Sequence, residues 1–249
     1  MKDNEIDDLN EYLEVMNPLT KKKLQIVSSE DIKQNFMMRL DTKVPKSFIP
    51  RMPISASNDP KQEDRTIPRV SVAPDVLSCI LAMGSLDREF LDGGKDIRKY
   101  FISGIYFHYA VKPSNKLLFD VDLTNEHWLL GYSKNTYKYI PFNIGSLFIV
   151  SVDRTFKNVN SGKKGLVFIE AYVHIEANMA IRLTKSKIVK PGYYALIVEK
   201  DNNAPASISK IDKKEYDAMR NLVISNEARR AHERELNKAS TSESILNRW

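Results

Sequence analysis

Apolar residues near the amino terminus recur at the spacing of an α-helix. The positions three or four residues apart are Ile6, Leu9, Leu13 and Met16. Asn17-Pro18 follows them and is a stop signal for a helix. A second short helix is expected near Ser29, with Ser28 or Ser29 as its N-cap. We therefore predict that residues 1–40 form a helical N-terminal segment.

Prolines interrupt the chain after this segment. They include Pro45, Pro50, Pro53 and Pro60. Because each proline removes a backbone donor and restricts φ, residues 41–65 are predicted to be a proline-rich loop without regular elements. A loop of this length is often functional, and a surface excursion is the alternative.

The most structured local signal is a short strand that leads directly into a buried helix. In residues 69–73, Val70 and Val72 alternate with Arg69, Ser71 and Ala73. The helix that follows has apolar positions at Val76, Leu77, Ile80 and Leu81, with Pro74 at its start, Asp75 at the positive end of its dipole and Gly84 as a C-terminal cap. This pattern places Arg69 and Ser71 on one side of the strand, near the start of the helix.

Strand-like alternation dominates the rest of the central region. The expected strands are Ile105–Val111, Leu123–Leu130, Leu147–Val152, Leu166–Ala177 and Tyr193–Glu199. The fold class that follows is α+β, with a mixed, mainly antiparallel sheet, one central helix and helical N- and C-terminal segments. Residues 66–200 are predicted to be the α+β core domain.

A charged helical pattern returns after the last expected strand. Residues 212–249 are predicted to form a charged helical C-terminal tail, in which charges of both signs are dense. Arg229, Arg230 and the terminal Trp249 are candidate contacts for a protein partner, since aromatic and arginine residues are enriched at interfaces.

Composition narrows the class of protein. The chain has 249 residues, a net charge of +6, 42% hydrophobic residues and one cysteine. This apolar content argues against disorder, and a single cysteine, Cys79, cannot form an intramolecular disulfide. With no signal peptide, no membrane span and no glycine-rich phosphate loop in the pattern, we expect a cytoplasmic protein without a P-loop.

Two kinds of chemistry are disfavoured by the pattern. Glu170, His174 and Glu176 share one strand face, but strand geometry spreads them too far for one ion, so we expect no metal site. Cys79 lies within an apolar helical stripe, where a thiol packs rather than reacts. An anion pocket remains, because Arg69, Ser71 and a helix start together favour a phosphate.

A resemblance sharpens the anion hypothesis. The order Arg69, Ser71 and then Glu126, spread over separate extended segments, resembles the Arg–Ser–Glu arrangement of ADP-ribosyltransferase-like folds, which bind NAD. The resemblance implies that Arg69 grips a phosphate, that Ser71 supports the nicotinamide ribose, and that Glu126 is catalytic, with Glu170 as a second candidate. The stretches Pro68–Pro74, Cys79–Ala82 and Thr124–Trp128 also resemble small proteins of tailed bacteriophages, which implies a host-cell cytoplasmic or virion location.

Other interpretations of the same residues stay open. Arg69 is also explained by a pair with Asp64 or Asp75, and Glu126 by a solvated strand position. A non-catalytic phage accessory or virion-associated protein, binding a partner through its C-terminal tail, is the alternative to a transferase. A nucleic-acid-associated factor that uses Lys21-Lys22-Lys23 and Arg229-Arg230 is a third hypothesis.

Overall fold

The computed structural model describes residues 2–53, 66–82, 98–114, 124–131, 138–155, 166–200, 206–222 and 225. The chain divides into two compact units. The first comprises Met1–Gly84, Tyr100–Gly145 and Ile175–Pro191, and the second comprises Ser85–Lys99, Ser146–His174 and Gly192–Trp249. No helix among the described residues is long and apolar enough to cross a membrane.

The first unit combines helices with short strands. Its elements are α1 (Lys2–Met16), α2 (Pro18–Lys21), β1 (Leu24–Ser28), α3 (Ser29–Ile32), β2 (Phe36–Asp41), β3 (Arg69–Val72), α4 (Val76–Leu81), β5 (Tyr109–Pro113), β6 (His127–Leu130), β9 (Ile181–Arg182) and β10 (Ile188–Val189). Most of β4 (Arg98–Tyr106), the start of β7 (Pro141–Thr155) and the end of β8 (Leu166–Ile175) also belong to it.

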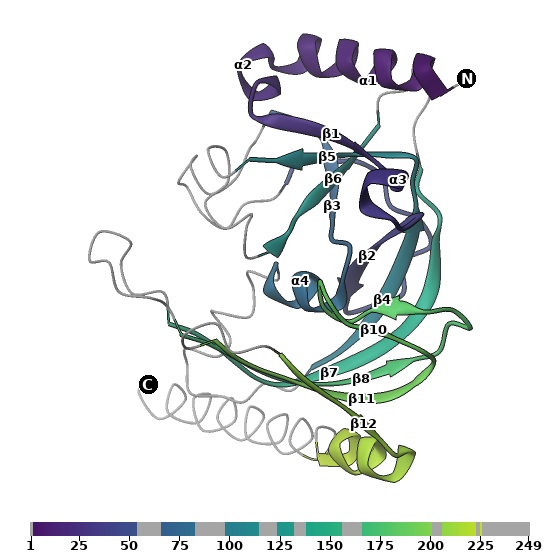
Figure 1. Cartoon of the computed structure of the whole chain (residues 1–249), viewed down its shortest axis with the longest axis vertical. Coiled ribbons are helices and arrows are strands. Elements are labelled where there is room, and N and C mark those ends of the chain that lie inside the picture. Colours follow the sequence, from purple (N-terminus) through teal and green to yellow (C-terminus); the bar gives the residue numbers. More distant parts are fainter. Residues whose placement is uncertain are drawn as a thin grey trace, which may run out of the picture. The chain divides into compact units, whose positions relative to one another are not determined.

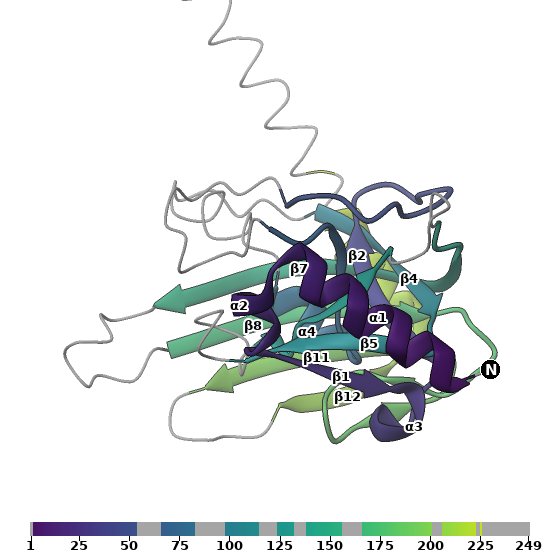
Figure 2. The same cartoon turned by 90° about the horizontal axis from the view of Figure 1, so that it is seen from above.

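One four-stranded sheet of this unit has the order β1-β5-β6-β3 (Figure 1). Its pairings are antiparallel, and Ser71 lies opposite Trp128. The helix α1 lies across β1 and β5 in both views (Figures 1 and 2), and its buried Leu9 and Leu13 pack with Trp128 and Leu130. The opposite side of the sheet packs on β2 and β4 through Val70, Met37 and Ile105, among others.

The predicted α+β class and mainly antiparallel sheet are confirmed. The prediction of a wholly helical N-terminal segment is wrong, because β1 and β2 lie within it. In β2, Met37, Arg39 and Asp41 alternate with Phe36, Met38 and Leu40, and the strand pairs with β4, far along the sequence. Pairing with a distant strand decides a conformation that local helical spacing cannot.

The predicted strand Ile105–Val111 is two strands. It breaks at Phe107 and His108, where the backbone bonds to Asn35 and Ser29 instead of continuing a ladder. Each half then joins a different partner, since β4 pairs with β2 and β5 pairs with β1. The strand-like alternation of side chains runs without interruption from Ile105 to Val111, so the sequence pattern gives no sign of the break.

The strand and helix expected from residue 69 onward are confirmed as β3 and α4. The helix begins at Val76, so the predicted start at Pro74 is wrong by two residues. Asp75 is instead the N-cap of α4, and its Oδ1 accepts a 2.9 Å hydrogen bond from the Ser78 backbone N–H. Cys79 is buried in the packed face of α4, as expected. The cap expected at Gly84 lies outside the described residues. In the proline-rich stretch, Phe48 and Arg51 form isolated backbone bridges with Tyr139 and Arg69.

The second unit holds the order β12-β11-β8-β7, with β11 (Gly192–Lys200) and β12 (Ser207–Ile211) antiparallel. Helical residues 213–222 follow β12 and bury Tyr216 against the ring of Phe148, with 5.5 Å between ring centroids. Tyr193 stacks on His174 beside them, with 4.2 Å between centroids. One aromatic cluster thus attaches the beginning of the predicted C-terminal helix, and Ser225 is the last described residue.

Gly104 in β4 is a position where any side chain meets an aromatic ring. A Cβ placed there would overlap the ring of Phe142, which also stacks on Tyr106 with 4.7 Å between centroids. We expect Gly104→Ala to lower the free energy of unfolding by about 1–3 kcal/mol, the usual cost of overpacking. Urea denaturation of the parent chain and the variant measures this change in the free energy of unfolding.

Phe142→Ala removes the obstructing ring and supplies the control. The double variant Gly104→Ala/Phe142→Ala should be no less stable than Phe142→Ala alone. If the two losses simply add, the ring is not what excludes a Cβ at this position.

Candidate functional site

Arg69, the predicted phosphate ligand, is almost fully buried, with 4% of its surface exposed. Its guanidinium carbon lies 4.0 Å from the centroid of the Trp128 ring, and Nη1 donates a 3.2 Å hydrogen bond to the carbonyl of Ile67. A cation on the face of an indole is stabilised by the ring quadrupole. These contacts hold Arg69 within the packed side of the sheet beneath α1.

Glu126, the predicted catalytic carboxylate, lies directly before β6. Its Oε1 accepts a 2.9 Å hydrogen bond from Nε1 of Trp128. The preceding residue, Asn125, has a φ of 47°, a left-handed conformation that asparagine tolerates better than most residues. Trp128 therefore contacts both Arg69 and Glu126 and connects two of the three predicted site residues.

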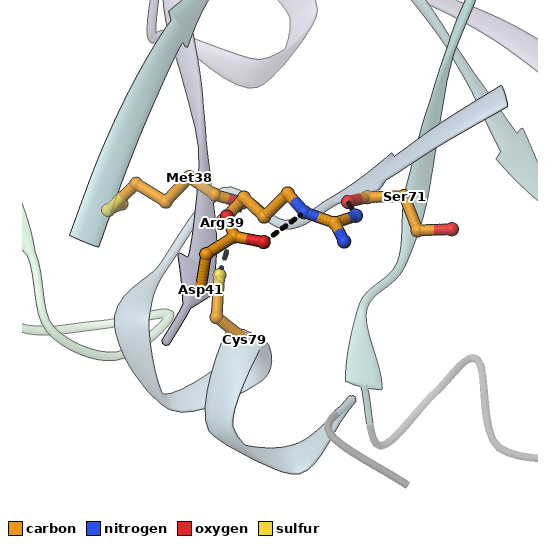
Figure 3. A network of polar contacts seen from close by, with 5 residues as sticks. All are labelled: Met38, Arg39, Asp41, Ser71 and Cys79. Carbon is orange, nitrogen blue, oxygen red and sulfur yellow. Dashed lines mark hydrogen bonds and ion pairs between the residues drawn. The ribbon is translucent and has the colours of Figure 1, made fainter. Parts of the chain in front are cut away.

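Ser71 shares the strand face of Arg69, two residues away, and lies opposite Trp128. Its carbonyl oxygen accepts a 3.0 Å hydrogen bond from Nη1 of Arg39, whereas its hydroxyl points away from Arg39 (Figure 3). The structure thus brings Arg69, Ser71 and Glu126 to one side of the β3–β6 pair. Leu9, Leu13 and Ile67 pack on the same side.

A hollow of about 510 Å³ lies on the other side of β3, at the margin of the core between the sheets. It is lined by Arg39, Asp41, Pro45, Ser47, Phe48, Ile49, Arg51, Arg69 and Val70. Three arginines and a single carboxylate in this lining make it a cationic site. Since Arg69 directs its guanidinium to Trp128, the side chains that set the charge of the hollow are Arg39, Arg51 and Asp41.

Arg39 is held from two directions (Figure 3). Its Nε donates to Oδ1 of Asp41 at 3.2 Å, its Nη1 donates to Ser71, and its guanidinium lies 5.4 Å from the centroid of the Phe48 ring. A guanidinium carries five N–H groups, so three of those on Arg39 have no partner among the described residues. The guanidinium of Arg39 is therefore held in one orientation and keeps N–H groups that can donate to a ligand.

Arg51 brings a second, exposed guanidinium to the hollow. Its backbone is fixed by reciprocal hydrogen bonds with Arg69, of 3.2 Å and 2.9 Å. Its side chain makes no hydrogen bond or ion pair with any residue in the described part of the chain. This arginine is therefore anchored by its backbone while its charge stays available.

Burial raises the pKa of Asp41, and the neighbouring charges of Arg39 and Arg51 act in the opposite direction. Its second oxygen, Oδ2, is buried and accepts no hydrogen bond within the described residues. Asp41 thus orients Arg39 through one oxygen and leaves a second acceptor beside it.

A separate polar cluster surrounds the start of α4 and is enclosed. Asp75 accepts hydrogen bonds from the backbone and the hydroxyl of Ser78, and burial raises its pKa. Nδ1 of His127 lies 2.8 Å from the carbonyl of Asn125, and burial lowers the pKa of His127 to about 4. Both titratable groups have protein partners, which suits a structural role.

Cys79 belongs to the same packed region. Its thiol donates to the carbonyl of Met38 at 3.2 Å, and burial raises the pKa well above the usual range (Figure 3). A thiol that stays protonated is a poor nucleophile. The expectation that Cys79 packs rather than reacts agrees with this environment.

The remaining predicted residues fall in several places. Glu170 accepts a hydrogen bond from Tyr172, and no group of three metal-ligating side chains occurs among the described residues. Lys21 pairs with Glu14 at 2.7 Å, while Lys22 and Lys23 are exposed. The partner contacts predicted at Arg229, Arg230 and Trp249, and most of the 212–249 tail, lie outside the described residues, as does Asp64.

Sequence reasoning missed Arg39, Asp41 and Arg51. The signal for the first two was present as the alternation within Phe36–Asp41, which puts both on one strand face. Arg51 follows Pro50 in the proline-rich stretch and carries no periodic signal. Its place depends on the backbone bridge to Arg69, which is visible only in the tertiary structure.

No family model matches the chain. Neither the curated proteins nor the solved structures contain a match.

Proposed function

We propose that this protein binds a phosphate-bearing nucleotide in the hollow lined by Arg39, Asp41 and Arg51. The observation that carries the proposal is the pair of arginines with N–H groups to offer, in a cavity with one carboxylate in its lining. Guanidinium groups bind phosphate oxygens in a fork geometry, and ligand cavities commonly occupy about 300–1,000 Å³.

The side chains that line the hollow favour a nucleotide over inorganic phosphate. Arg39 is pre-oriented by Asp41 and Ser71, so it loses little side-chain entropy when a phosphate binds. Asp41 lines the hollow, and a carboxylate in the lining is an acceptor that suits a ribose hydroxyl. The exposed side chain of Ile49 adds an apolar part to the lining, as a nucleoside requires.

NAD is the first ligand to test, because the sequence resembles ADP-ribosyltransferase-like proteins of phages. The resemblance gives Arg69 and Ser71 the role of supporting the cofactor and Glu126 the role of catalysis. Because these three residues lie on the α1 side of β3, Glu126 can act on NAD only if the nicotinamide end of the ligand extends from the hollow to that side. Their clustering around Trp128 supports a common role, and the packing of α1 over them supports a role in positioning the strand that also borders the hollow. Phosphate binding itself is assigned here to Arg39 and Arg51.

Calorimetry with NAD, ADP and inorganic phosphate tests the proposal. Arg51→Ala should weaken nucleotide binding roughly 10- to 100-fold, since a hydrogen bond to a charged group contributes about 1.5–3 kcal/mol. Arg220→Ala, which removes an exposed arginine elsewhere, is the matched control and should change affinity less than about twofold. Equal losses in both variants, or no binding of any nucleotide, would contradict the proposal.

Glu126→Gln separates binding from catalysis. The transferase hypothesis is supported if the parent chain releases nicotinamide from NAD and Glu126→Gln binds NAD without releasing nicotinamide. Binding without nicotinamide release retains the nucleotide site and removes the transferase. If Glu126→Gln abolishes binding and Arg51→Ala does not, the ligand occupies the α1 side of the sheet and the hollow is the wrong site.

A further inference from the structure

A second concave surface lies in the first unit, away from the arginine-lined hollow. It is a groove of about 470 Å³ between α1, β1 and α3. Its residues are Ile6, Asn10, Leu13, Lys21, Leu24, Ile26, Ser28, Ser29, Glu30, Asp31, His108 and Tyr109. Figure 2 shows α3 near the amino-terminal end of α1, with β1 beneath.

The side chains of the groove divide into an apolar floor and a polar margin. Ile6, Leu13, Leu24, Ile26 and Tyr109 are the apolar members. Four of these five are partly exposed rather than buried, so the floor has apolar surface that another chain can cover. A floor of this kind accepts aliphatic anchor residues.

Carboxylates flank the groove on both sides. On the α3 side, Glu30 and Asp31 line it and are exposed. On the α1 side, Asp7 and Glu14 lie three residues before and four residues after Asn10, so helical spacing places them along the edge of the groove. Glu14 neutralises Lys21, the one lysine or arginine in the lining among the described residues.

This acidity is local. The helix α1 contains six carboxylates and a single lysine, although the chain as a whole has a net charge of +6. A basic ligand is therefore attracted to the carboxylates of α1 and α3, and the exposed Lys22 and Lys23, which follow Lys21, are the opposing charges near the groove. The combination of carboxylate margins and an apolar floor is complementary to a basic amphipathic segment.

We infer that the groove between α1, β1 and α3 binds a lysine- or arginine-rich peptide segment of a partner protein that carries aliphatic anchor residues. The segment places its apolar side chains on Ile6, Leu24 and Ile26, and its cations beside Asp7 and Glu30. This inference is independent of the proposed nucleotide site, because the two surfaces have no lining residue in common.

A short synthetic peptide of leucine and lysine, with its leucines on one helical face, is the probe for this groove. Fluorescence anisotropy with the full chain should show saturable binding that weakens as salt is raised. Asp7→Lys should weaken it roughly tenfold, whereas Asp8→Lys, the same change on the far side of α1, should alter it less than about twofold.

Asn10→Trp tests the groove without changing charge. The indole should fill the floor and weaken peptide binding, while the melting temperature stays close to that of the parent chain, because Asn10 is only half-buried. The inference is wrong if Asp7→Lys and Asp8→Lys have equal effects, or if Asn10→Trp binds the peptide as tightly as the parent chain. It is also wrong if the lysine peptide does not bind, or if the peptide with glutamate in place of lysine binds equally well.

Discussion

Trp128→Ala should lower the free energy of unfolding by about 3–5 kcal/mol, the range measured for removing a large buried aromatic side chain. Trp128 is fully buried and packs with Leu9 and Leu13 of α1. Its ring also supports the guanidinium of Arg69, and its Nε1 donates to Glu126. The substitution therefore opens a cavity and removes a partner from two charged groups at once.

Urea denaturation of the variant gives this loss directly. Trp128→Phe is the control, because it retains an aromatic ring while removing the N–H that Glu126 accepts, and its loss should be clearly smaller. A loss below about 1 kcal/mol for Trp128→Ala would show that the ring is not enclosed as described. The chain has two tryptophans, so a Trp249→Phe background lets Trp128 fluorescence report its burial.

Acid should destabilise the protein between pH 6.5 and pH 4 through His127. With 3% of its surface exposed, burial lowers the pKa of His127 to about 4 in the folded state. In the unfolded chain its pKa is about 6.5, so only the unfolded state binds the proton in this window. Stability that is present above pH 6.5 is then lost as the pH falls toward 4. Because one pKa unit corresponds to about 1.36 kcal/mol, the loss is at most about 3 kcal/mol.

His127→Gln isolates this contribution from other titrating groups. The stability difference between parent and variant, measured by urea denaturation at pH 7, 5.5 and 4, should shift in favour of the variant as the pH falls. Asp75 acts in the opposite direction, because its raised pKa makes the folded state the tighter proton binder, but it is present in both proteins. A difference that does not change with pH would contradict the assignment to His127.

The local part of the fold follows from the sequence. Helical spacing predicts α1, alternation predicts β3, β8 and β11, and Ser28, one of the two predicted N-caps, marks the start of α3. These features depend on neighbours within a few residues, which is why a pattern reveals them. The common strand face of Arg69 and Ser71 belongs to the same class.

The candidate site required the tertiary structure. Arg39 was hidden in a segment predicted as helix, and the strand containing it exists because β4 pairs with it from more than 50 residues away. Arg51 reaches the hollow through its backbone bridge to Arg69.

A sequence pattern also could not predict which side chains and cavities surround each site residue. Which side of β3 is covered by α1, and which side borders a cavity, depends on the packing of distant elements. The sequence by itself determined the elements built from local periodicity and capping, together with the charged residues available to a site. Long-range strand pairing and burial determined which of those charges face a ligand and which are enclosed in the core.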